Sequence, residues 1–225
     1  MNIDHKKIEN LIVLIRSDDY FDQGINLCRK MGMKTDTLLD ALGFSVQFVT
    51  VPGGSAEVGE NESRATVNLE EVDMAATMTT VAQWVALRDW VHTGSEKRKV
   101  TEADREDTRP VVNVTAFDAE EYCRRLTLIY NLDDETVEVR LPHSAEWEVA
   151  AKGGENYAYA GSDDPDEVAW YSANSNYQLQ PVGLKKPNGY GLYDMSGNAY
   201  TWTCTEWDSD DPSGAKAYMK RNDLA

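Results

Sequence analysis

Basic residues and long apolar runs are both scarce in this chain of 225 residues. Twenty-two Lys and Arg stand against 39 Asp and Glu, which leaves a net charge of −17. Because nucleic acids and anionic membrane surfaces attract basic proteins, this charge argues against both as partners. The apolar run 11–15 is the longest near the start, and Arg16 follows it rather than a small-residue cleavage site. We therefore expect neither a membrane span nor a signal peptide.

Cysteine is scarce as well, with three residues in unrelated contexts: Cys28, Cys123 and Cys204. An odd number without CxxC spacing does not indicate a disulfide framework or a zinc site, so we expect a cytoplasmic protein. What the chain does have is 41% hydrophobic residues with 6 Trp and 11 Tyr, enough to build a folded core.

The first 42 residues show apolar residues at helical spacing. A break at 17–19 separates two such patterns, and Thr35 is placed to cap a third helix that ends before Gly43. We predict a small helical appendage over residues 1–42, which packs on its neighbour or on a second subunit. The residues of the pattern are Ile8, Leu11, Ile12, Ile15, Phe21, Ile25 and Cys28.

Beyond residue 43 the texture changes to mixed strand and helix. The segment 44–51 alternates like a strand and stops at Pro52 and two glycines. Helices are predicted from Thr79 or Thr80 to about Val91, from Thr115 to about Ile129, and from Ser144 to just before Gly153. Residues 93–109 are charged and are expected to form a solvated loop.

After Gly154 the chain is rich in Tyr, Trp, Asn and Gly and has little periodicity. Long irregular loops held by aromatic anchors are expected there. Such loops need side-chain partners for their backbone polar groups, and amides are suited to that role. The candidates are Asn174, Asn176, Asn188 and Asn198.

Six blocks of this region resemble one known family in their content and order. They are 51–54 (VPGG), 109–115 (RPVVNVT), 118–126 (DAEEYCRRL), 140–142 (RLP), 145–154 (AEWEVAAKGG) and 187–198 (PNGYGLYDMSGN). Over about residues 44–221 the chain resembles the formylglycine-generating enzyme (sulfatase-modifying factor) domain. The resemblance implies an α+β, C-type-lectin-like fold with much irregular loop over residues 43–225, preceded by the helical appendage.

The resemblance also implies a calcium site in the loop that matches 191–202. Asp194 matches a side-chain ligand, and Gly197 and Ala199 match backbone-carbonyl ligands. Thr201 stands where the family usually has an acidic residue, so we expect a weakened affinity for calcium. Asn174 matches one position of a second calcium site, but the loop that follows it is too short to supply the other ligands.

The family's chemistry is copper-dependent oxidation of a substrate cysteine to formylglycine by a pair of cysteines late in the domain. The corresponding stretch here is 218–221, and the sequence reads on only to Ala225, so residues 1–225 lack that pair and the closing strands. Soft thiolates suit Cu(I), so copper is not expected and no catalytic residue is assigned. Cys123 and Cys204 are expected to pack in the fold, and His143 to cap a helix or lie at the surface.

Three functions remain open. The first is a non-catalytic recognition module for a protein or a small carbohydrate-like ligand, on a scaffold that phage and bacterial ligand-binding proteins also use. The second is a copper-dependent protein-modifying oxidase. The third is an inactive partner subunit of a bacterial system, which docks or oligomerises through residues 1–42 or through a sheet edge left uncovered at the C-terminus.

For the recognition module, an aromatic and amide-rich surface carries the ligand. The same aromatic residues can instead form the core of a loop-rich domain. The residues of this surface are Trp170, Tyr171, Asn174, Asn176, Tyr177, Trp202 and Trp207.

Overall fold

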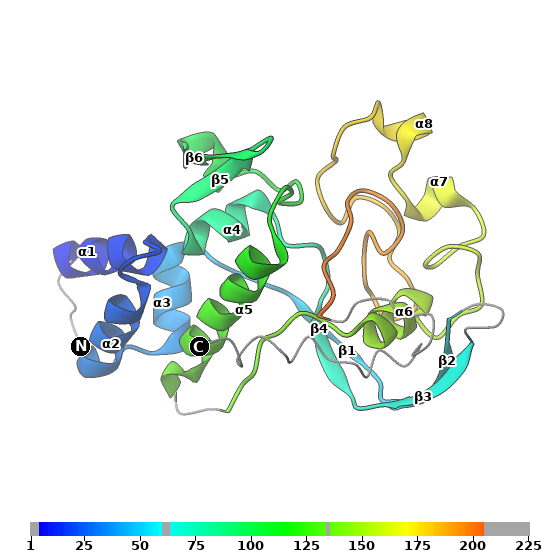
Figure 1. Ribbon diagram of the computed structural model, residues 1–225, viewed down its shortest axis with the longest axis horizontal. Coiled ribbons are helices and arrows are strands. Elements are labelled where there is room, and N and C mark those ends of the chain that lie inside the picture. Colours follow the sequence, from blue (N-terminus) through cyan, green and yellow to red (C-terminus); the bar gives the residue numbers. More distant parts are fainter. Residues whose placement is uncertain (1–4, 60–63, 134–135, 205–225) are drawn as a thin grey trace. The chain divides into compact units, whose positions relative to one another are not determined.

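The computed structural model describes residues 5–59, 64–133 and 136–204 (Figure 1). It divides into two compact units: the first contains 1–45 and 79–140, and the second contains 46–78 and 141–225. The first unit is mainly helical, and the second combines short strands with irregular loops. No helix within the described ranges has the length and apolar character needed to cross a membrane.

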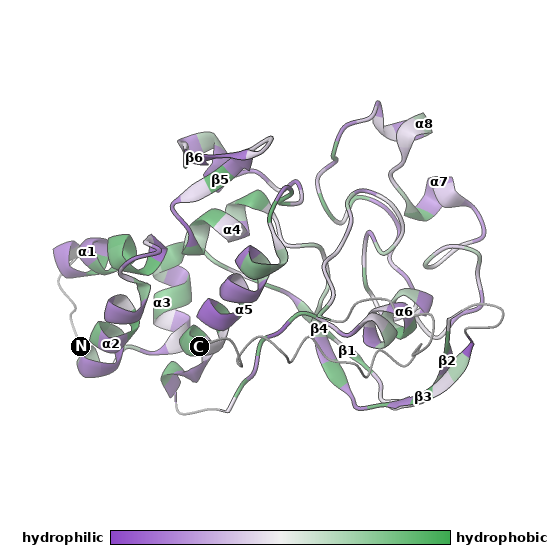
Figure 2. Ribbon diagram, in the orientation of Figure 1, coloured by the Kyte–Doolittle hydropathy of each residue, from purple (hydrophilic) through white to green (hydrophobic). Residues whose placement is uncertain are grey.

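The first unit begins with three helices, α1 (His5–Arg16), α2 (Phe21–Met31) and α3 (Thr35–Leu42), which confirms the helical prediction for this segment. Figure 2 shows hydrophobic and hydrophilic residues alternating around these ribbons, and the apolar faces are buried. Both α2 and α3 end at a glycine with positive φ, Gly32 at 62° and Gly43 at 66°. Glycine adopts this conformation without the steric cost that a Cβ would add.

Thr35 does not cap α3, contrary to the sequence prediction. Lys34 occupies the N-cap position, and Thr35 is the first residue of the helix. The Thr35 hydroxyl donates to the Ile129 carbonyl at 3.0 Å, and its backbone N–H donates to the Asp133 carboxylate at 3.1 Å. The side chain is buried and attaches α3 to the end of α5, a long-range use that local capping rules cannot anticipate.

The two central helices, α4 (Val81–Leu87) and α5 (Ala116–Tyr130), begin as predicted. Each starts with a capping box, in which the N-cap threonine and the third helical residue satisfy each other's backbone N–H groups. The N-cap residues are Thr80 and Thr115. The buried face of α5 includes Tyr122, Arg125 and Leu126, whereas Cys123, expected on that face, is half-buried.

The predicted end of α4 near Val91 is wrong. The helix stops at Leu87, Arg88 is extended, and Trp90–Thr93 forms strand β5, which pairs antiparallel with β6 (Glu96–Lys99). The segment expected to be one solvated loop therefore contains half of a hairpin, followed by the short helix η2 (Glu102–Arg105). Aromatic and β-branched residues after Arg88 fit a strand better than a continuing helix.

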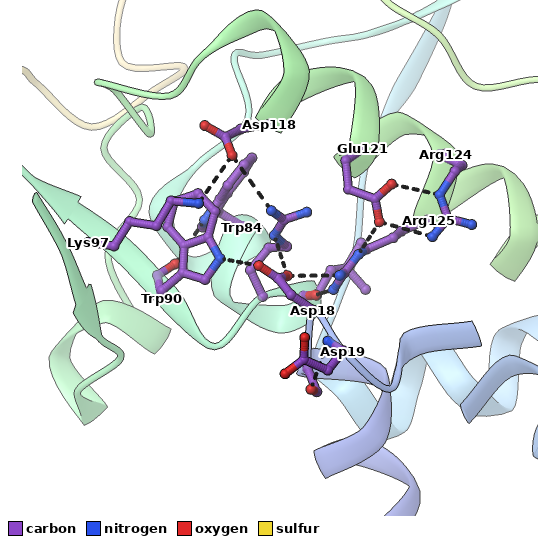
Figure 3. Close-up of polar contacts among 12 residues, drawn as sticks. Asp18, Asp19, Trp84, Trp90, Lys97, Asp118, Glu121, Arg124 and Arg125 are labelled. Carbon is purple, nitrogen blue, oxygen red and sulfur yellow. Dashed lines mark hydrogen bonds and ion pairs between the residues drawn. The ribbon is translucent and has the colours of Figure 1, made fainter. Parts of the chain in front are cut away.

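A cluster of charges joins the α1–α2 connection to α4 and α5 (Figure 3). The Asp18 carboxylate accepts hydrogen bonds from Trp90 Nε1 and Arg125 Nη2, both at 2.8 Å. Its Oδ1 also lies 3.2 Å from Arg88 Nε. Arg125 donates further to the Leu87 carbonyl at 2.6 Å. One carboxylate therefore serves two guanidinium groups that are almost fully buried.

The aromatic rings of the first unit enclose the Arg88 guanidinium. It lies 5.3 Å from the Trp84 ring centroid and 4.9 Å from that of Trp90. Burial lowers the pKa of Arg88 and the neighbouring Arg125 lowers it further, while Asp18 acts in the opposite direction. The ring faces provide a favourable environment for a cation that has lost much of its water.

The second unit contains two antiparallel strand pairs. Strand β1 (Phe48–Val51) pairs with β4 (Val72–Ala75), and β2 (Gly54–Val58) pairs with β3 (Ala65–Leu69). β1 starts four residues later than the predicted strand over 44–51, because Phe44 and Ser45 belong to the helical unit.

Helix α6 (Ser144–Lys152) begins and ends where the sequence predicts. Its Ala150 packs with Val51 and Leu192 in one buried cluster, and its Ala145 packs with Val58 and Val67 in another. The helix thus carries the core of the unit.

From the end of α6 to residue 204 the second unit is irregular, as predicted, and this described part contains only the short helices α7 (Pro165–Val168) and α8 (Ser172–Ser175). The Asn188 side chain makes hydrogen bonds to backbone groups that a neighbouring strand would otherwise satisfy. Its Nδ2 donates to the Ala150 carbonyl at 2.7 Å, and its Oδ1 accepts the N–H groups of Tyr190 and Leu192, each at 3.1 Å. A side-chain amide therefore fixes the loop against the end of α6.

We predict that Asp18→Asn destabilises the first unit, because Arg88 and Arg125 lose their shared counter-charge. Asp18 is 41% exposed, so the effect is smaller than that of breaking a fully buried pair: about 1–2 kcal/mol of unfolding free energy, or roughly 3–6 °C in Tm. Thermal unfolding followed by circular dichroism measures it.

Asp19→Asn is the matched control, because Asp19 is exposed and its substitution removes the same charge from the neighbouring position. Equal Tm shifts for the two variants would contradict a specific role for Asp18.

Candidate functional site

Asp194 is the centre of the loop where the sequence predicts a cation. It is 2% exposed and has a φ of 56°, a left-handed conformation rare for Asp. Oδ2 accepts the Gly183 N–H at 2.8 Å, while the buried Oδ1 has no hydrogen-bond partner among the residues described. A buried carboxylate oxygen without a donor is costly, so this geometry favours an added proton or cation.

The protonation of Asp194 reflects this environment. Burial raises the pKa of the Asp194 carboxyl above its ordinary 3.8, and the Gly183 N–H and the Asn198 side chain offset only part of that rise. The cause is loss of solvation for the charged form. Burial therefore favours the protonated form of Asp194 over the charged form.

The predicted calcium ligands include a single carboxylate. Asp194 supplies one carboxylate, and the other predicted ligands, Gly197 and Ala199, supply only backbone carbonyls. Thr201 is exposed. Within 5–59, 64–133 and 136–204 no group of three His, Cys, Asp or Glu side chains is arranged to hold a metal. Calcium affinity depends on carboxylate charge, so one such ligand predicts weak binding.

Asn174, matched to a second calcium site, is occupied by its own loop. Its amide nitrogen donates to Asp166 Oδ1 and to the Ala169 carbonyl, both at 3.0 Å. Its Oδ1 accepts the Tyr171 N–H at 2.9 Å. These bonds close the turn at α8, which is the backbone-satisfying role expected for this residue.

Three of the predicted surface aromatics are exposed: Tyr171, Tyr177 and Trp202. Trp170 is half-buried beneath Lys185, whose Nζ lies 4.2 Å from the ring centroid. Asn174 is half-buried and Asn176 is exposed, while Trp207 lies outside the described residues.

Sequence reasoning missed three further exposed aromatics in the described loops that follow α6: Tyr157, Tyr159 and Tyr200. They lie in the same aperiodic, Gly- and Asn-rich region, so that texture could have indicated them. Tyr200 is fully exposed and Tyr177 is 88% exposed. Large exposed rings in loops are typical of binding surfaces.

Backbone contacts join the two segments that carry these rings. Trp170 and Gly197 form a parallel bridge, and the Asn198 N–H donates to the Trp170 carbonyl at 2.8 Å. The Gln180 backbone N–H donates to Asn198 Oδ1, and Asn198 Nδ2 donates to the Gln180 carbonyl, both at 3.1 Å. Tyr171 and Tyr200 therefore follow closely on residues that are bonded to each other.

Tyr177 adopts an unfavourable backbone conformation. It has a φ of 57°, directly after Asn176 at 54°. Asn tolerates this region, but a bulky residue occupies it at a cost of order 1 kcal/mol or more. Strain of this kind concentrates at functional loops, and here it holds a tyrosine in solvent.

The three cysteines occupy separate environments, and none forms a disulfide. Cys28 is buried in α2, where burial raises its pKa to about 11. Cys123 is half-buried on α5. Cys204 is also half-buried, and its Sγ lies 3.2 Å from His143 Nδ1. His143 is the N-cap residue of α6, one of the placements expected from its sequence position.

Comparison with known proteins gives the family. Residues 43–222 match the model of the sulfatase-modifying factor enzyme 1-like domain. The chain belongs to this family. The family resemblance of the six sequence blocks is thereby confirmed, together with a scaffold of the formylglycine-generating-enzyme type.

The chain matches different fractions of the lengths of its relatives in this family. The chaperone protein LppX of Paenibacillus barcinonensis is 30% identical over 83% of the chain and 78% of its own length. The formylglycine-generating enzyme of Mycobacterium tuberculosis is 34% identical over 55% of the chain. The match spans only 42% of that enzyme's length.

The solved structure of Treponema denticola variable protein 1 resembles the chain with a TM-score of 0.60 at 26% identity, covering 73% of the chain and 76% of that protein. The predicted α+β, C-type-lectin-like fold class is confirmed by this likeness.

We predict that Asp194→Asn changes how stability depends on pH in metal-free buffer. Because folding raises the pKa of Asp194, the folded state binds its proton more tightly than the unfolded state. The carboxyl's contribution to stability is therefore favourable at low pH and is lost as pH rises from 3.8 through the folded pKa.

Relative to Asp194→Asn, the wild-type Tm should accordingly fall as pH rises across this window and then stay level. Thermal melts from pH 3.5 to 7.5 with a chelator measure the difference. A constant difference over the whole range would show that the carboxyl is not desolvated.

Proposed function

We propose that the chain is a non-catalytic recognition module that uses exposed aromatic residues of its second unit to bind a protein ligand. The observation that carries this proposal is the solvent exposure of rings on loops that are internally well bonded. Tyr177, Tyr200 and Trp202 are 88%, 107% and 48% exposed. Isolated exposed rings are common, but several on adjoining loops favour an interaction surface.

The physical chemistry of these rings suits recognition. Tyrosine offers a large contact area and a hydroxyl, yet binding immobilises only two side-chain torsions. The loops beneath are held by Asn174, Asn188 and Asn198, so little backbone entropy is lost on binding. A small carbohydrate-like ligand is the alternative occupant of the same surface.

The relatives support this proposal without deciding it. A chaperone protein and a variable protein share the scaffold, and neither is named as an oxidase. The likeness to the Mycobacterium enzyme keeps the copper-dependent oxidase as the second candidate. Cys28 is a poor copper ligand for that role, because a thiol with a raised pKa supplies little thiolate for a soft metal.

Calcium at Asp194 is part of the same proposal. A cation that binds the buried Oδ1 and the carbonyls of Gly197 and Ala199 would stiffen the loop that leads to Tyr200. We propose a cytoplasmic location as well, because the three cysteines form no disulfide.

Calcium is expected to raise the Tm of the wild type at neutral pH and to leave Asp194→Asn unchanged. Millimolar calcium suffices for a weak site, with a gain of about 1 kcal/mol at a few times the Kd. Magnesium at equal ionic strength is the control. An equal rise for both proteins would place the effect elsewhere.

When the protein is cross-linked to its partner in the host cell, replacing Tyr177, Tyr200 and Trp202 together by Ala should abolish capture of that partner. Each ring is expected to contribute about 1–2 kcal/mol, so a single variant weakens the Kd of the purified partner about tenfold. Cross-linking followed by mass spectrometry, then titration with the partner identified, measures both.

Val13→Ala with Leu27→Ala is the matched control, since both side chains are exposed on α1 and α2. Loss of the partner in this control alone would favour the third candidate, a subunit that docks through residues 1–42. A captured protein that carries a formylglycine in place of cysteine would favour the oxidase.

A further inference from the structure

Cys204 and His143 form a thiol–imidazole pair that neither the family's calcium site nor the aromatic surface uses. The Cys204 N–H donates to the Pro142 carbonyl at 2.9 Å, which aligns the segment before α6 with the segment that ends the described chain. This alignment brings Cys204 Sγ to 3.2 Å from His143 Nδ1. A nucleophile and a base within hydrogen-bond reach are the basis of thiol reactivity.

The position of the pair at a helix start strengthens this chemistry. His143 is the N-cap of α6, a helix of nine residues whose first backbone N–H groups carry partial positive charge. A helix N-terminus and an imidazolium both stabilise a thiolate. Glu146 is the charged group of α6 that opposes them, and its Oε2 accepts the His143 backbone N–H at 2.8 Å.

The other two thiols provide an internal comparison. Cys28 is buried, and its pKa is raised to about 11. Cys123 is half-buried on α5, like Cys204. Cys204 has a histidine nitrogen 3.2 Å from its sulfur.

We infer that Cys204, with His143 as its proton acceptor, is a modification site for disulfides of small thiols. The Cys204 proton passes to His143 Nδ1, and the thiolate attacks one sulfur of the disulfide. A new S–S bond forms at Cys204 while the original S–S bond breaks. The departing thiolate takes up the proton, so the disulfide is reduced as Cys204 is oxidised.

The expected gain in rate is modest, while the shift in its pH profile is large. A thiolate stabilised by an imidazolium and a helix N-terminus forms at a lower pH than that of an ordinary thiol. The more stable thiolate is intrinsically a weaker nucleophile, which offsets part of the gain in rate at neutral pH. The pH midpoint is therefore the decisive quantity.

The test is stopped-flow reaction of the folded protein with 5,5′-dithiobis(2-nitrobenzoate) from pH 5.5 to 9.5, with peptide mapping of the first residue labelled. Cys204 should be labelled before Cys123, with a midpoint at least one pH unit below that of an unstructured cysteine peptide. In His143→Asn the midpoint should return to the peptide value, because Asn keeps the helix cap and removes the base.

Cys204→Ser should remove the fast phase, and Cys123→Ser, the matched control, should retain it. Circular dichroism verifies the fold of each variant. The inference is overturned if Cys123 reacts first, or if folded His143→Asn keeps the wild-type midpoint. A midpoint for Cys204 at or above that of the peptide overturns it as well.

Discussion

One carboxylate, Asp18, links the first helices to two buried arginines of the first unit. Arg88 and Arg125 have side chains 4% and 1% exposed, and two adjacent guanidinium groups at that depth repel each other and have lost their water. Asp18 opposes both while also binding the Trp90 indole. Because Asp18 belongs to the α1–α2 connection, detaching the first helices would remove this shared counter-charge and leave only Glu121, 2.9 Å from Arg125, and Asp118, 3.8 Å from Arg88. This explains physically why residues 1–45 form one compact unit with 79–140.

The second unit is held by a different principle. Its strand pairs are short, and much of its backbone after α6 lies in loops. Asparagine amides satisfy the polar groups that a sheet would otherwise pair, as Asn188 does at the end of α6. Rigidity obtained from side chains leaves the loop tips free to carry tyrosines.

Local signals predicted the features that depend on local interactions. The capping boxes at Thr80 and Thr115 and the glycine ends of α3 and α6 involve residues within one turn of each other. Features that depend on distant residues were missed. The Thr35 hydroxyl donates to a carbonyl 94 positions away in the sequence. The buried Arg125 pairs with Asp18, which is 107 positions away.

The same division applies to the candidate site. Composition indicated Tyr171 and Tyr177, because aromatic residues stood out in an aperiodic stretch. The Cys204–His143 contact spans 61 positions and has no sequence signature, since neither residue lies in a motif. Tyr200 was missed because its neighbours resemble a family block, which drew attention to ligand positions rather than to exposure.

The bridge between Trp170 and Gly197 has a consequence for which positions can diversify. A Cβ at Gly197 would collide with the Trp170 carbonyl, and its φ of 83° would strain any other residue. Tyr200, a few positions away, is fully exposed and faces no such restriction, whereas the Tyr171 hydroxyl donates to Asp166 Oδ1 at 2.9 Å. Descendants of this chain could therefore exchange the projecting side chains and acquire new ligands, while the glycine beneath them stays invariant.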